Sequence, residues 1–297
     1  MLSILIPTFD YNIYNLVCEL QNQCSQLGIA FEIIAQDDAS NSEYTIENQK
    51  INALENCRFI INTTNLGRGK NRNSLANQSN YPWLLFLDCD TTPTSNTFIE
   101  NYINATSKAD AVFGGLAYQL EPPKDDELLR WKYGKNREAL SLQERLQNPT
   151  QTALTSNLFI KKEVFLSHPF DSAIIAYGYE DYLFFLNLKQ NHISISHIEN
   201  AVIHLGLETS KQFLEKTKVA TENLVWIAQK HPILVADNKI IKAYNQLTAF
   251  GLSTLFGFFF QRFKSKIESQ LVSKNPSLFL FDLYKLGCFF LAKKQQH

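Results

Sequence analysis

Hydrophobic residues in the first half of the chain come in short continuous runs separated by longer polar stretches. Such runs predict buried strands, because their apolar residues do not alternate with polar ones. Each polar stretch is long enough for a helix that connects two parallel strands. The expected strands are Leu2–Ile6, Phe31–Ala35, Arg58–Ile61 and Trp83–Leu87, and the expected helices are Tyr14–Leu27, Ser42–Leu54 and Arg68–Ser79. The pattern predicts an α/β fold with a Rossmann-like, mostly parallel, doubly wound sheet.

The middle of the chain continues this pattern less regularly. A single strand is expected over Ala111–Tyr118, and the charged segment Glu121–Arg145 is expected to form a loop and a helix over the sheet edge. Further expected elements are a strand at Leu158–Lys161, a helix at Tyr182–Gln190, and a strand or strand pair within Ser194–Leu205. The strand-forming pattern ends near residue 210.

From about Lys211 onward the spacing becomes helical, which predicts a helical C-terminal extension over residues 211–297. Two apolar pieces of it, Leu247–Phe260 and Leu278–Leu291, are each shorter than the ~20 residues that a membrane-spanning helix needs. Basic residues follow both pieces, namely Arg262, Lys264, Lys266, Lys293 and Lys294. Two interpretations stay open: a cap that packs on the core or on a second copy in a homodimer, and a patch on a membrane surface.

The composition suits a folded globular protein, with 45% hydrophobic and 19% charged residues. A formal net charge of -1 gives no general attraction to nucleic acid, so we expect no nucleic-acid partner. Five scattered cysteines favour reduced thiols over a disulfide framework or a zinc site. The first residues resemble a strand rather than a signal peptide, so we expect a cytoplasmic protein. The apolar extension suggests an alternative, in which the protein makes peripheral contact with the inner face of the membrane.

Polar residues follow the expected strands at their carboxyl ends, where open α/β sheets bind ligands. The strongest local signal is Asp88-Cys89-Asp90, after the fourth strand. Two residues apart in an extended chain, the two carboxylates point to the same side, and their hard oxygens suit Mg²⁺ or Mn²⁺. Taken alone, Asp88 and Asp90 are also compatible with a solvated turn.

Two further acidic pairs each allow a structural and a functional interpretation. Asp37-Asp38 ends the second strand, where it either caps the next helix or accepts hydrogen bonds from a nucleotide. Glu180-Asp181 follows a Gly-aromatic turn, where it complements a helix dipole, holds a general base against an acceptor hydroxyl, or does both.

Five motifs occur in a fixed order along the chain: Ser3–Phe9, Asp37–Ser40, Asn65–Gly67 with Arg72-Asn73, Leu87–Asp90, and Gly178–Asp181. In this order they resemble the family 2 glycosyltransferases of the GT-A fold, and five motifs together are far more specific than any one. The resemblance implies a GT-A domain over residues 1–210, with a donor half to about residue 120 and an acceptor half over about 121–210.

The resemblance also implies a nucleotide-sugar donor and Mn²⁺ or Mg²⁺ as cofactor. The donor-binding residues that it implies are Pro7, Thr8, Asp10, Asp38, Asn65, Arg72 and Asp88. Asp90 is the expected direct metal ligand, with Asp88 beside it. His204 occupies the place of a histidine that completes the metal site in many relatives, although a lone histidine at a strand end is commonly an ordinary core or surface residue.

Asp181 is implied as the catalytic base, with Glu180 beside it, in a direct attack that inverts the anomeric configuration. Ala39 departs from the family's pattern, since it replaces the usual Gly of the Asp-Asp-Gly-Ser turn. Glu127–Trp131 only partly matches the Gln-x-x-Arg-Trp signature of processive synthases and precedes the Glu-Asp motif, so we expect a non-processive enzyme that transfers one sugar per encounter.

The acceptor is expected to be a glycan or glycolipid in cell-surface polysaccharide assembly. The residues expected on the acceptor side are Arg130, Trp131 and Tyr133. Aromatic rings stack on sugars and basic side chains hydrogen-bond them, although a single Trp is more often a core anchor.

Two other function classes stay open. A sugar nucleotidyltransferase would normally have a Gly- and basic-rich phosphate loop after the first strand, but Pro7–Asn12 contains no glycine or basic residue. A non-catalytic nucleotide-sugar-binding or scaffold protein would be expected to lose its acidic motifs, and all three acidic pairs are present.

Overall fold

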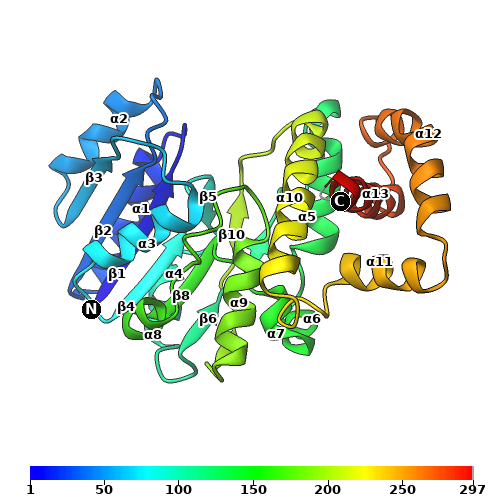
Figure 1. Cartoon of the computed structure of the whole chain (residues 1–297). Coiled ribbons are helices and arrows are strands. Elements are labelled where there is room, and N and C mark those ends of the chain that lie inside the picture. The colour runs from blue at the N-terminus through cyan, green and yellow to red at the C-terminus, as the bar shows by residue number, and fades with distance from the viewer. Residues whose placement is uncertain (296–297) are drawn as a thin grey trace. The chain divides into compact units, whose positions relative to one another are not determined.

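The computed structural model describes residues 1–295, which divide into two compact units (Figure 1). The sheet unit consists of Met1–Gln119, Glu138–Ile175 and Glu180–Gly206. The helical unit consists of Leu120–Arg137, Ala176–Tyr179 and the chain from Leu207 onward. Residues 120–137 therefore join the C-terminal extension in one unit, although they lie far from it in sequence.

A seven-stranded sheet forms the centre of the sheet unit, in the order β3-β2-β1-β4-β8-β6-β9. Strands β1 to β4 are parallel, β8 is antiparallel to both of its neighbours, and β6 and β9 are parallel. The bounds are β1 Leu2–Thr8, β2 Phe31–Asp37, β3 Cys57–Ile61, β4 Trp83–Leu87, β6 Ala111–Phe113, β8 Asn157–Lys161 and β9 Ile195–His197. The expected α/β fold with a mostly parallel sheet is confirmed.

The central strands are buried along nearly their whole length. Ile4 of β1, Ile33 of β2 and Leu85 of β4 have no exposed surface. A strand covered on both faces needs apolar side chains at successive positions, which explains the continuous hydrophobic runs. Strands β1 and β2 extend beyond their expected ends, because the parallel ladder continues through the Thr8–Asp37 pair.

A second, three-stranded sheet has the order β5 (Thr91–Pro93), β10 (Val202–His204) and β7 (Leu116–Ala117). The expectation of one strand over Ala111–Tyr118 is wrong, because two glycines interrupt it. A Cβ at Gly114 would lie 2.3 Å from the Asn200 carbonyl oxygen, and Gly115 has φ +104°, which other residues rarely adopt. The chain therefore leaves the large sheet after β6 and enters the small sheet at β7.

Helices connect the strands of the sheet unit, and α3 packs against β1 and β2 (Figure 1). The helix expected over Ser42–Leu54 is shorter than predicted and ends in a 3₁₀ turn, η1. The bounds are α1 Tyr14–Gln26, α2 Thr45–Gln49, η1 Lys50–Ala53, α3 Arg68–Gln78, α4 Phe98–Ile103, α6 Leu142–Gln147, α7 Pro149–Thr152, α8 Lys162–Ser167 and α9 Glu180–Gln190.

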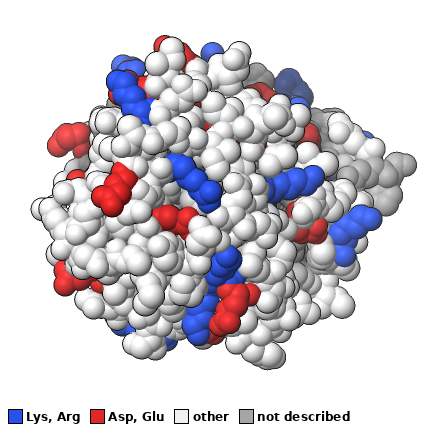
Figure 2. Space-filling view, turned by 90° about the vertical axis from the view of Figure 1, so that its left-hand side faces the viewer, with Lys and Arg blue, Asp and Glu red and all other residues white. Residues whose placement is uncertain are grey.

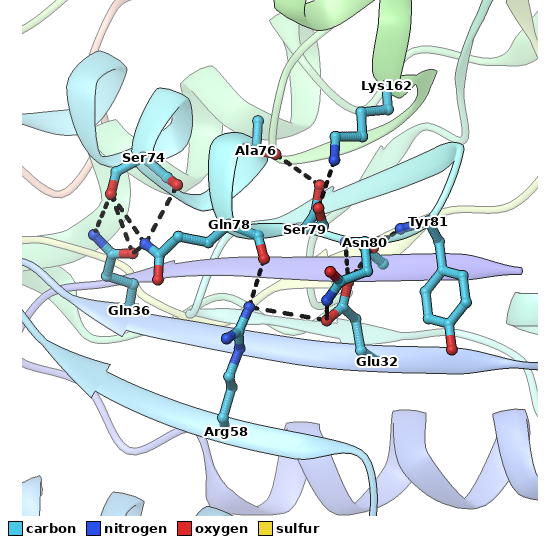
Figure 3. Close-up of polar contacts among 11 residues, drawn as sticks. Glu32, Gln36, Arg58, Ser74, Ala76, Gln78, Ser79, Asn80, Tyr81 and Lys162 are labelled. Carbon is cyan, nitrogen blue, oxygen red and sulfur yellow. Dashed lines mark hydrogen bonds and ion pairs between the residues drawn. The ribbon is translucent and has the colours of Figure 1, made fainter.

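A polar network fixes the turn between α3 and β4 at the edge where the parallel strands begin (Figure 3). The Glu32 carboxylate accepts hydrogen bonds from Ser3 Oγ at 2.6 Å and from both the backbone and the side-chain amide of Asn80. Arg58 donates to the carbonyl of Gln78, the last residue of α3. Carbonyls at a helix end lack an intrahelical partner, so this bond satisfies one of them.

The helical unit is built around α13, which contacts α5, α10, α11 and α12. The bounds are η2 Asp125–Glu127, α5 Leu128–Arg137, α10 Ser210–Lys230, α11 Lys239–Ala249, α12 Ser253–Leu271 and α13 Leu278–Gln295. The buried core side chains are Leu129, Phe213, Leu214, Phe260, Leu271, Phe281, Tyr284 and Cys288. The C-terminal extension thus shares a hydrophobic core of its own with α5.

The apolar piece Leu247–Phe260 is not a single helix. It spans the end of α11, a turn and the start of α12. Gly251 in that turn has φ +69°, the left-handed conformation that glycine commonly adopts just after a helix. The other piece, Leu278–Leu291, lies wholly within α13. Among residues 1–295, no helix is both long and apolar enough to cross a membrane.

Acidic and basic side chains are interspersed on the face of the sheet unit that carries β3 and α2 (Figure 2). Some of them form local pairs, such as Lys50 with Glu47, whose charged atoms lie 2.6 Å apart. A mixed surface of this kind has little long-range attraction for a highly charged polymer.

Candidate active site

The carboxyl ends of β1, β2 and β4 lie side by side, because β1 pairs with both of the other strands. The loops that follow them carry Asp10, Asp38 and Asp88. Hydrogen bonds join the first two loops: the Asp38 N–H donates to the Thr8 carbonyl at 2.9 Å, and Ser42 Oγ donates to Asp10 Oδ1 at 2.8 Å. The topology thus gathers these predicted donor-binding residues at one edge of the sheet.

The Asp38 carboxylate organises the loop that precedes α3. Its Oδ1 accepts from the Leu66 N–H and the Asn62 side-chain amide, and its Oδ2 accepts from the Gly67 N–H, each at 2.8 Å. Asn65 Nδ2 donates to the Asp38 carbonyl at 3.0 Å. An ionised carboxylate has about four acceptor positions, so at least one remains for a ligand.

The other residues predicted at the nucleoside end differ in accessibility. Thr8 is buried, and its hydroxyl donates to the Ile6 carbonyl, so this side chain supports the end of β1. Pro7 is half-buried and Asp10 is exposed. Of the predicted residues at this strand end, Pro7 and Asp10 are therefore the ones that a ligand can reach.

The buried Arg72 on α3 forms an ion pair with the partly exposed Asp88, with 2.6 Å between Nη2 and Oδ1. Burial lowers the pKa of Arg72, but the negative charges of Asp88 and Asp181 outweigh this effect and raise it. Its Nε and Nη1 atoms are buried and have no hydrogen-bond partner within residues 1–295. A buried guanidinium with unused donors is suited to bind an oxyanion.

Asp181 and Glu180 occupy the first turn of α9. Asp181 Oδ2 accepts a hydrogen bond from Thr155 Oγ1 at 2.7 Å, which orients the carboxylate. Asp181 Oδ1 and Glu180 Oε2 are both buried and lack a hydrogen-bond partner in the described part of the chain. Burial, and next the charge of Asp181, raise the pKa of Glu180 above its ordinary value. A fixed carboxylate with one free oxygen has the form of a general base.

His204 lies beside Asp90 because β10 pairs with β5 in a register that sets His204 opposite Thr91. His204 Nε2 is 3.3 Å from Asp90 Oδ2, and the Leu205 N–H donates to the Asp90 carbonyl at 2.8 Å. Burial raises the pKa of Asp90, and His204 opposes this rise. A Cβ at Gly206 would lie 2.3 Å from Asp90 Oδ2, so only a glycine lets the backbone approach the carboxylate this closely.

Asp90 and His204 fit a divalent cation as a pair of neighbouring ligands. Two adjacent ligands of an octahedral Mg²⁺ or Mn²⁺ lie about 3 Å apart, close to the separation observed here. Asp88 Oδ1 accepts a hydrogen bond from Arg72, and a metal contact of Asp88 stays a prediction. Residues 1–295 contain no group of three or more His, Cys, Asp or Glu side chains that could hold a metal ion. A cation at Asp90 and His204 would take its remaining ligands from water or from a bound substrate.

Two residues of this site, Arg68 and Tyr11, belong to none of the sequence motifs. The charge of Arg68 acts on Asp90, Glu180 and Arg72, which places it within the same charged cluster. Burial, and next the charge of Asp90, raise the pKa of Tyr11. The available signal for Arg68 was its spacing, one helical turn before Arg72 on the same side of α3.

The residues expected on the acceptor side, Arg130, Trp131 and Tyr133, lie on α5 in the helical unit. Tyr133 packs on the Phe213 ring, and the Arg130 guanidinium lies over the same ring, so both contribute to the core of that unit. Trp131 lines a cavity of about 340 Å³ in the helical unit, with Lys135 Nζ 4.6 Å from its ring centroid. Contact of these residues with an acceptor stays a prediction.

A family model described as Glycosyl transferase family 2 matches residues 3–166, which is more than half of the chain. The chain belongs to this family. Within the family 2 match lie the loops after β1, β2 and β4 and the Arg72–Asp88 pair, whereas Asp181 and His204 lie beyond its end.

Two kinds of relative accompany this family 2 match. An uncharacterized glycosyltransferase of Haemophilus influenzae is 27% identical over 201 residues, 64% of this chain and 62% of its own length. A mannosyltransferase of Pyrobaculum calidifontis, solved with GDP-Man and Mn²⁺, has 11% identity and a TM-score of 0.59 over 99% of this chain and 87% of its own. That likeness confirms the GT-A fold. S. aureus TarS 1-349 has 17% identity and a TM-score of 0.48 over 99% of this chain and 90% of its own.

Proposed function

We propose that this protein is a metal-dependent, inverting glycosyltransferase that moves one sugar from a nucleotide-diphosphate sugar to an acceptor hydroxyl. The observation that carries the proposal is the meeting of three charged groups at one sheet edge: the Arg72–Asp88 pair, the Asp90–His204 pair and the oriented Asp181. Membership of family 2 supports sugar transfer. The mannosyltransferase of similar fold, with its GDP-Man and Mn²⁺, supports a nucleotide sugar and a divalent cation.

In this proposal the donor's nucleoside lies against Pro7, Asp10 and the remaining acceptor position of Asp38. Thr8 and Asn65 hold that pocket in shape through their bonds to the backbone. These groups offer oxygen acceptors to the N–H and O–H donors of a base and ribose.

The donor's diphosphate would lie near the buried Arg72 and the exposed Arg68, and both side chains supply positive charge. The unused Nε and Nη1 donors of Arg72 match phosphate oxygens in geometry and charge. Asp88 keeps this guanidinium in place and stands beside the donor. Asp90 and His204 would hold Mn²⁺ or Mg²⁺, which when bound stabilises negative charge on the leaving diphosphate.

Asp181 is proposed as the base that accepts the acceptor's hydroxyl proton through its free Oδ1. The acceptor oxygen then bonds to the anomeric carbon as the bond to the diphosphate breaks on the opposite side, which inverts the configuration. Thr155 keeps the carboxylate oriented throughout. Glu180, whose pKa is raised by burial and by the charge of Asp181, stands beside it. The expected acceptor is a glycan or glycolipid in cell-surface polysaccharide assembly.

The test is a thermal-shift screen of nucleoside diphosphates with and without Mn²⁺, on the wild type and on Asp90→Ala. A matched control is Asp126→Ala, since Asp126 is an exposed acid in the helical unit. At a ligand concentration a hundredfold above its Kd, binding stabilises the folded state by about 2.7 kcal/mol. We expect one nucleotide to raise Tm only with Mn²⁺, and this rise to be lost in Asp90→Ala and kept in Asp126→Ala.

Each contrary result favours a specific alternative. If no diphosphate stabilises the folded protein, the chain is a scaffold without a donor site. If nucleoside triphosphates and sugar phosphates stabilise it instead, the chain is a sugar nucleotidyltransferase. If a nucleotide sugar binds but no acceptor mixture yields a new glycoside, the chain is a non-catalytic nucleotide-sugar-binding protein.

A further inference from the structure

Helix α12 presents one side to solvent, and the residues on it are of two kinds. Phe258 and Phe259 lie three and four residues after Leu255, Arg262 lies four and three residues after them, and Lys266 lies four residues further on, so the five project from the same side of the helix. We refer to these five residues as the outward face of α12. Its first half is apolar, and its second half is basic.

The apolar half of the outward face is strongly exposed. Leu255 is 53%, Phe258 is 64% and Phe259 is 49% exposed. The opposite side of α12 anchors the helix: Phe260 is buried, and it packs so closely on Gly287 of α13 that a Cβ there would lie 2.3 Å from its ring. The outward face is therefore not needed to hold α12 in its unit.

Further exposed apolar side chains adjoin the outward face. Phe250 and Leu252 in the turn before α12 are 77% and 44% exposed, and Phe263 is 41% exposed. Arg262 Cζ and Lys266 Nζ lie 5.9 and 5.8 Å from the Phe263 ring centroid, so the cations stand directly beside aromatic surface. A concentration of exposed apolar residues on this scale marks an interaction surface.

The charges on α12 decide which kind of partner fits. Residues 250–266 contain Arg262, Lys264 and Lys266 but no Asp or Glu. Glu268, the one acidic residue of α12, bonds to Lys264 and to Tyr284 of α13, away from the outward face. A two-fold interface with a second copy would bring this face against itself and bury like charges without counter-charges. An anionic lipid surface supplies those counter-charges.

We propose that the outward face of α12 binds the surface of an anionic phospholipid bilayer, with α12 lying in the plane of the membrane. Phe258 and Phe259 enter the boundary between headgroups and acyl chains, where aromatic side chains are favoured. Arg262 and Lys266 contact the lipid phosphates.

The test is flotation of the full chain with vesicles of phosphatidylcholine alone and of equimolar phosphatidylcholine and phosphatidylglycerol. Binding requires no sugar donor, so its outcome is separable from that of the transferase assay. We expect the wild type to float only with the anionic vesicles, and binding to weaken as salt is added, because charge attraction is screened over about 10 Å at 0.1 M salt. Addition of the anionic vesicles should shift the tryptophan fluorescence of Phe258→Trp to shorter wavelength by more than it shifts that of the wild type.

Two variants test the two halves of the outward face. Phe258→Ser with Phe259→Ser, and separately Arg262→Glu with Lys266→Glu, should each reduce the partition constant by about tenfold or more. The controls are Ile46→Ser, at a 78% exposed apolar residue on α2, and Lys108→Glu, at an exposed lysine of the sheet unit. Both controls should bind as the wild type does.

Three results would overturn the proposal. The first is a wild type that stays unbound on anionic vesicles at low salt, with no change in the emission of Phe258→Trp. The second is equal loss of binding in the Ile46→Ser control. The third is a doubled mass by light scattering that Phe258→Ser with Phe259→Ser returns to the monomer value, which would assign the surface to a second copy.

Discussion

Arg72 Nη2 lies 2.6 Å from Asp88 Oδ1, and this pair joins α3 to the end of β4. Asp88 is therefore paired with the Arg72 guanidinium, whereas Asp90 faces His204. The two carboxylates of one Asp-x-Asp motif therefore have different partners. In the proposed function, the first holds the positive charge of Arg72 near the donor and the second contributes to a metal site.

Replacement of Arg72 tests how much the Arg72–Asp88 pair contributes to the free energy of unfolding. Arg72→Ala leaves Asp88 and the half-buried Asp181 without this counter-charge. Removal of one partner of a buried pair costs about 3 kcal/mol or more. We expect urea unfolding to give a free energy of unfolding lower by about that amount. Asp88 is partly exposed, which keeps the loss at the low end of the range.

Arg72→Lys and Asp88→Asn are the matched controls. Lysine keeps the charge but loses the planar set of donors, so its loss of stability should be smaller and its donor binding weaker. In Asp88→Asn the amide oxygen would still accept the bond from Arg72. An unchanged free energy of unfolding in Arg72→Ala would contradict the role given to this pair.

Asp181→Asn should abolish most of the transfer while leaving donor binding intact. The amide oxygen can still accept from Thr155, but the side chain can no longer take a proton, so kcat should fall by about 10²- to 10⁴-fold. Thr155→Val should lower kcat by less, because it removes only the orienting bond. Steady-state kinetics, together with the nucleotide-induced Tm shift, separates the two effects.

Thr106→Val serves as the control for Thr155→Val, since the Thr106 hydroxyl donates only to the Ile103 carbonyl at the end of α4. Its kcat should equal that of the wild type. Full transferase activity in Asp181→Asn would remove Asp181 from the reaction.

The strands could be predicted from the sequence because a strand that is buried on both faces has a continuous run of apolar residues. Trp83–Leu87 has the predicted bounds, and β1 and β2 differ only where the ladder continues into polar residues. The gathering of acidic loops at one edge also followed, since parallel strands end together. These features depend on local pattern and on the topology of parallel sheets.

Side-chain pairing could not be predicted in the same way. The bond from Arg72 to Asp88, and the place of Arg68 in the charged cluster, depend on how a helix packs on a strand end. The interruption at Gly114-Gly115 was also missed, because its apolar flanks fit a single strand. The close approach of the Asn200 carbonyl oxygen to Gly114 is a long-range contact that no local pattern reports.

Glu180→Gln should make the protein more stable at neutral pH. Burial raises the pKa of Glu180 above its ordinary value of 4.5, so the folded state holds this proton more tightly than the unfolded chain. As pH rises above 4.5, the unfolded state loses its proton first, and stability falls by up to about 1.4 kcal/mol per pH unit until the folded pKa is passed.

The glutamine variant lacks this titration, so its Tm should decline less between about pH 5 and pH 7. Glu163→Gln, at an exposed residue of α8, should follow the wild type. A steeper decline in Glu180→Gln would mean that the carboxylate stabilises the fold in its charged form.

His197 should make the protein sensitive to acid. Burial, together with the charge of the neighbouring Arg145, lowers the pKa of His197 to about 4, and the bond to the Pro149 carbonyl opposes this shift. Above pH 6.5 the imidazole is neutral in both states, and between pH 6.5 and 4 only the unfolded chain takes up a proton. Stability is therefore lost as pH falls through this window.

In His197→Gln the loss of Tm between pH 6.5 and pH 4 should be smaller than in the wild type. His192→Gln, at an exposed histidine, is the control and should keep the wild-type pH profile. An identical profile in His197→Gln would show that other groups cause the acid sensitivity.

The break at Gly114-Gly115 links remote backbone geometry to the proposed chemistry. It directs the chain from the large sheet into the small one, where β7 pairs with β10, and β10 carries His204 to Asp90. A side chain at Gly114 would collide with the Asn200 carbonyl oxygen just before β10. Such a substitution would be expected to weaken the proposed cation binding at Asp90 and His204, although both of these residues would be unaltered.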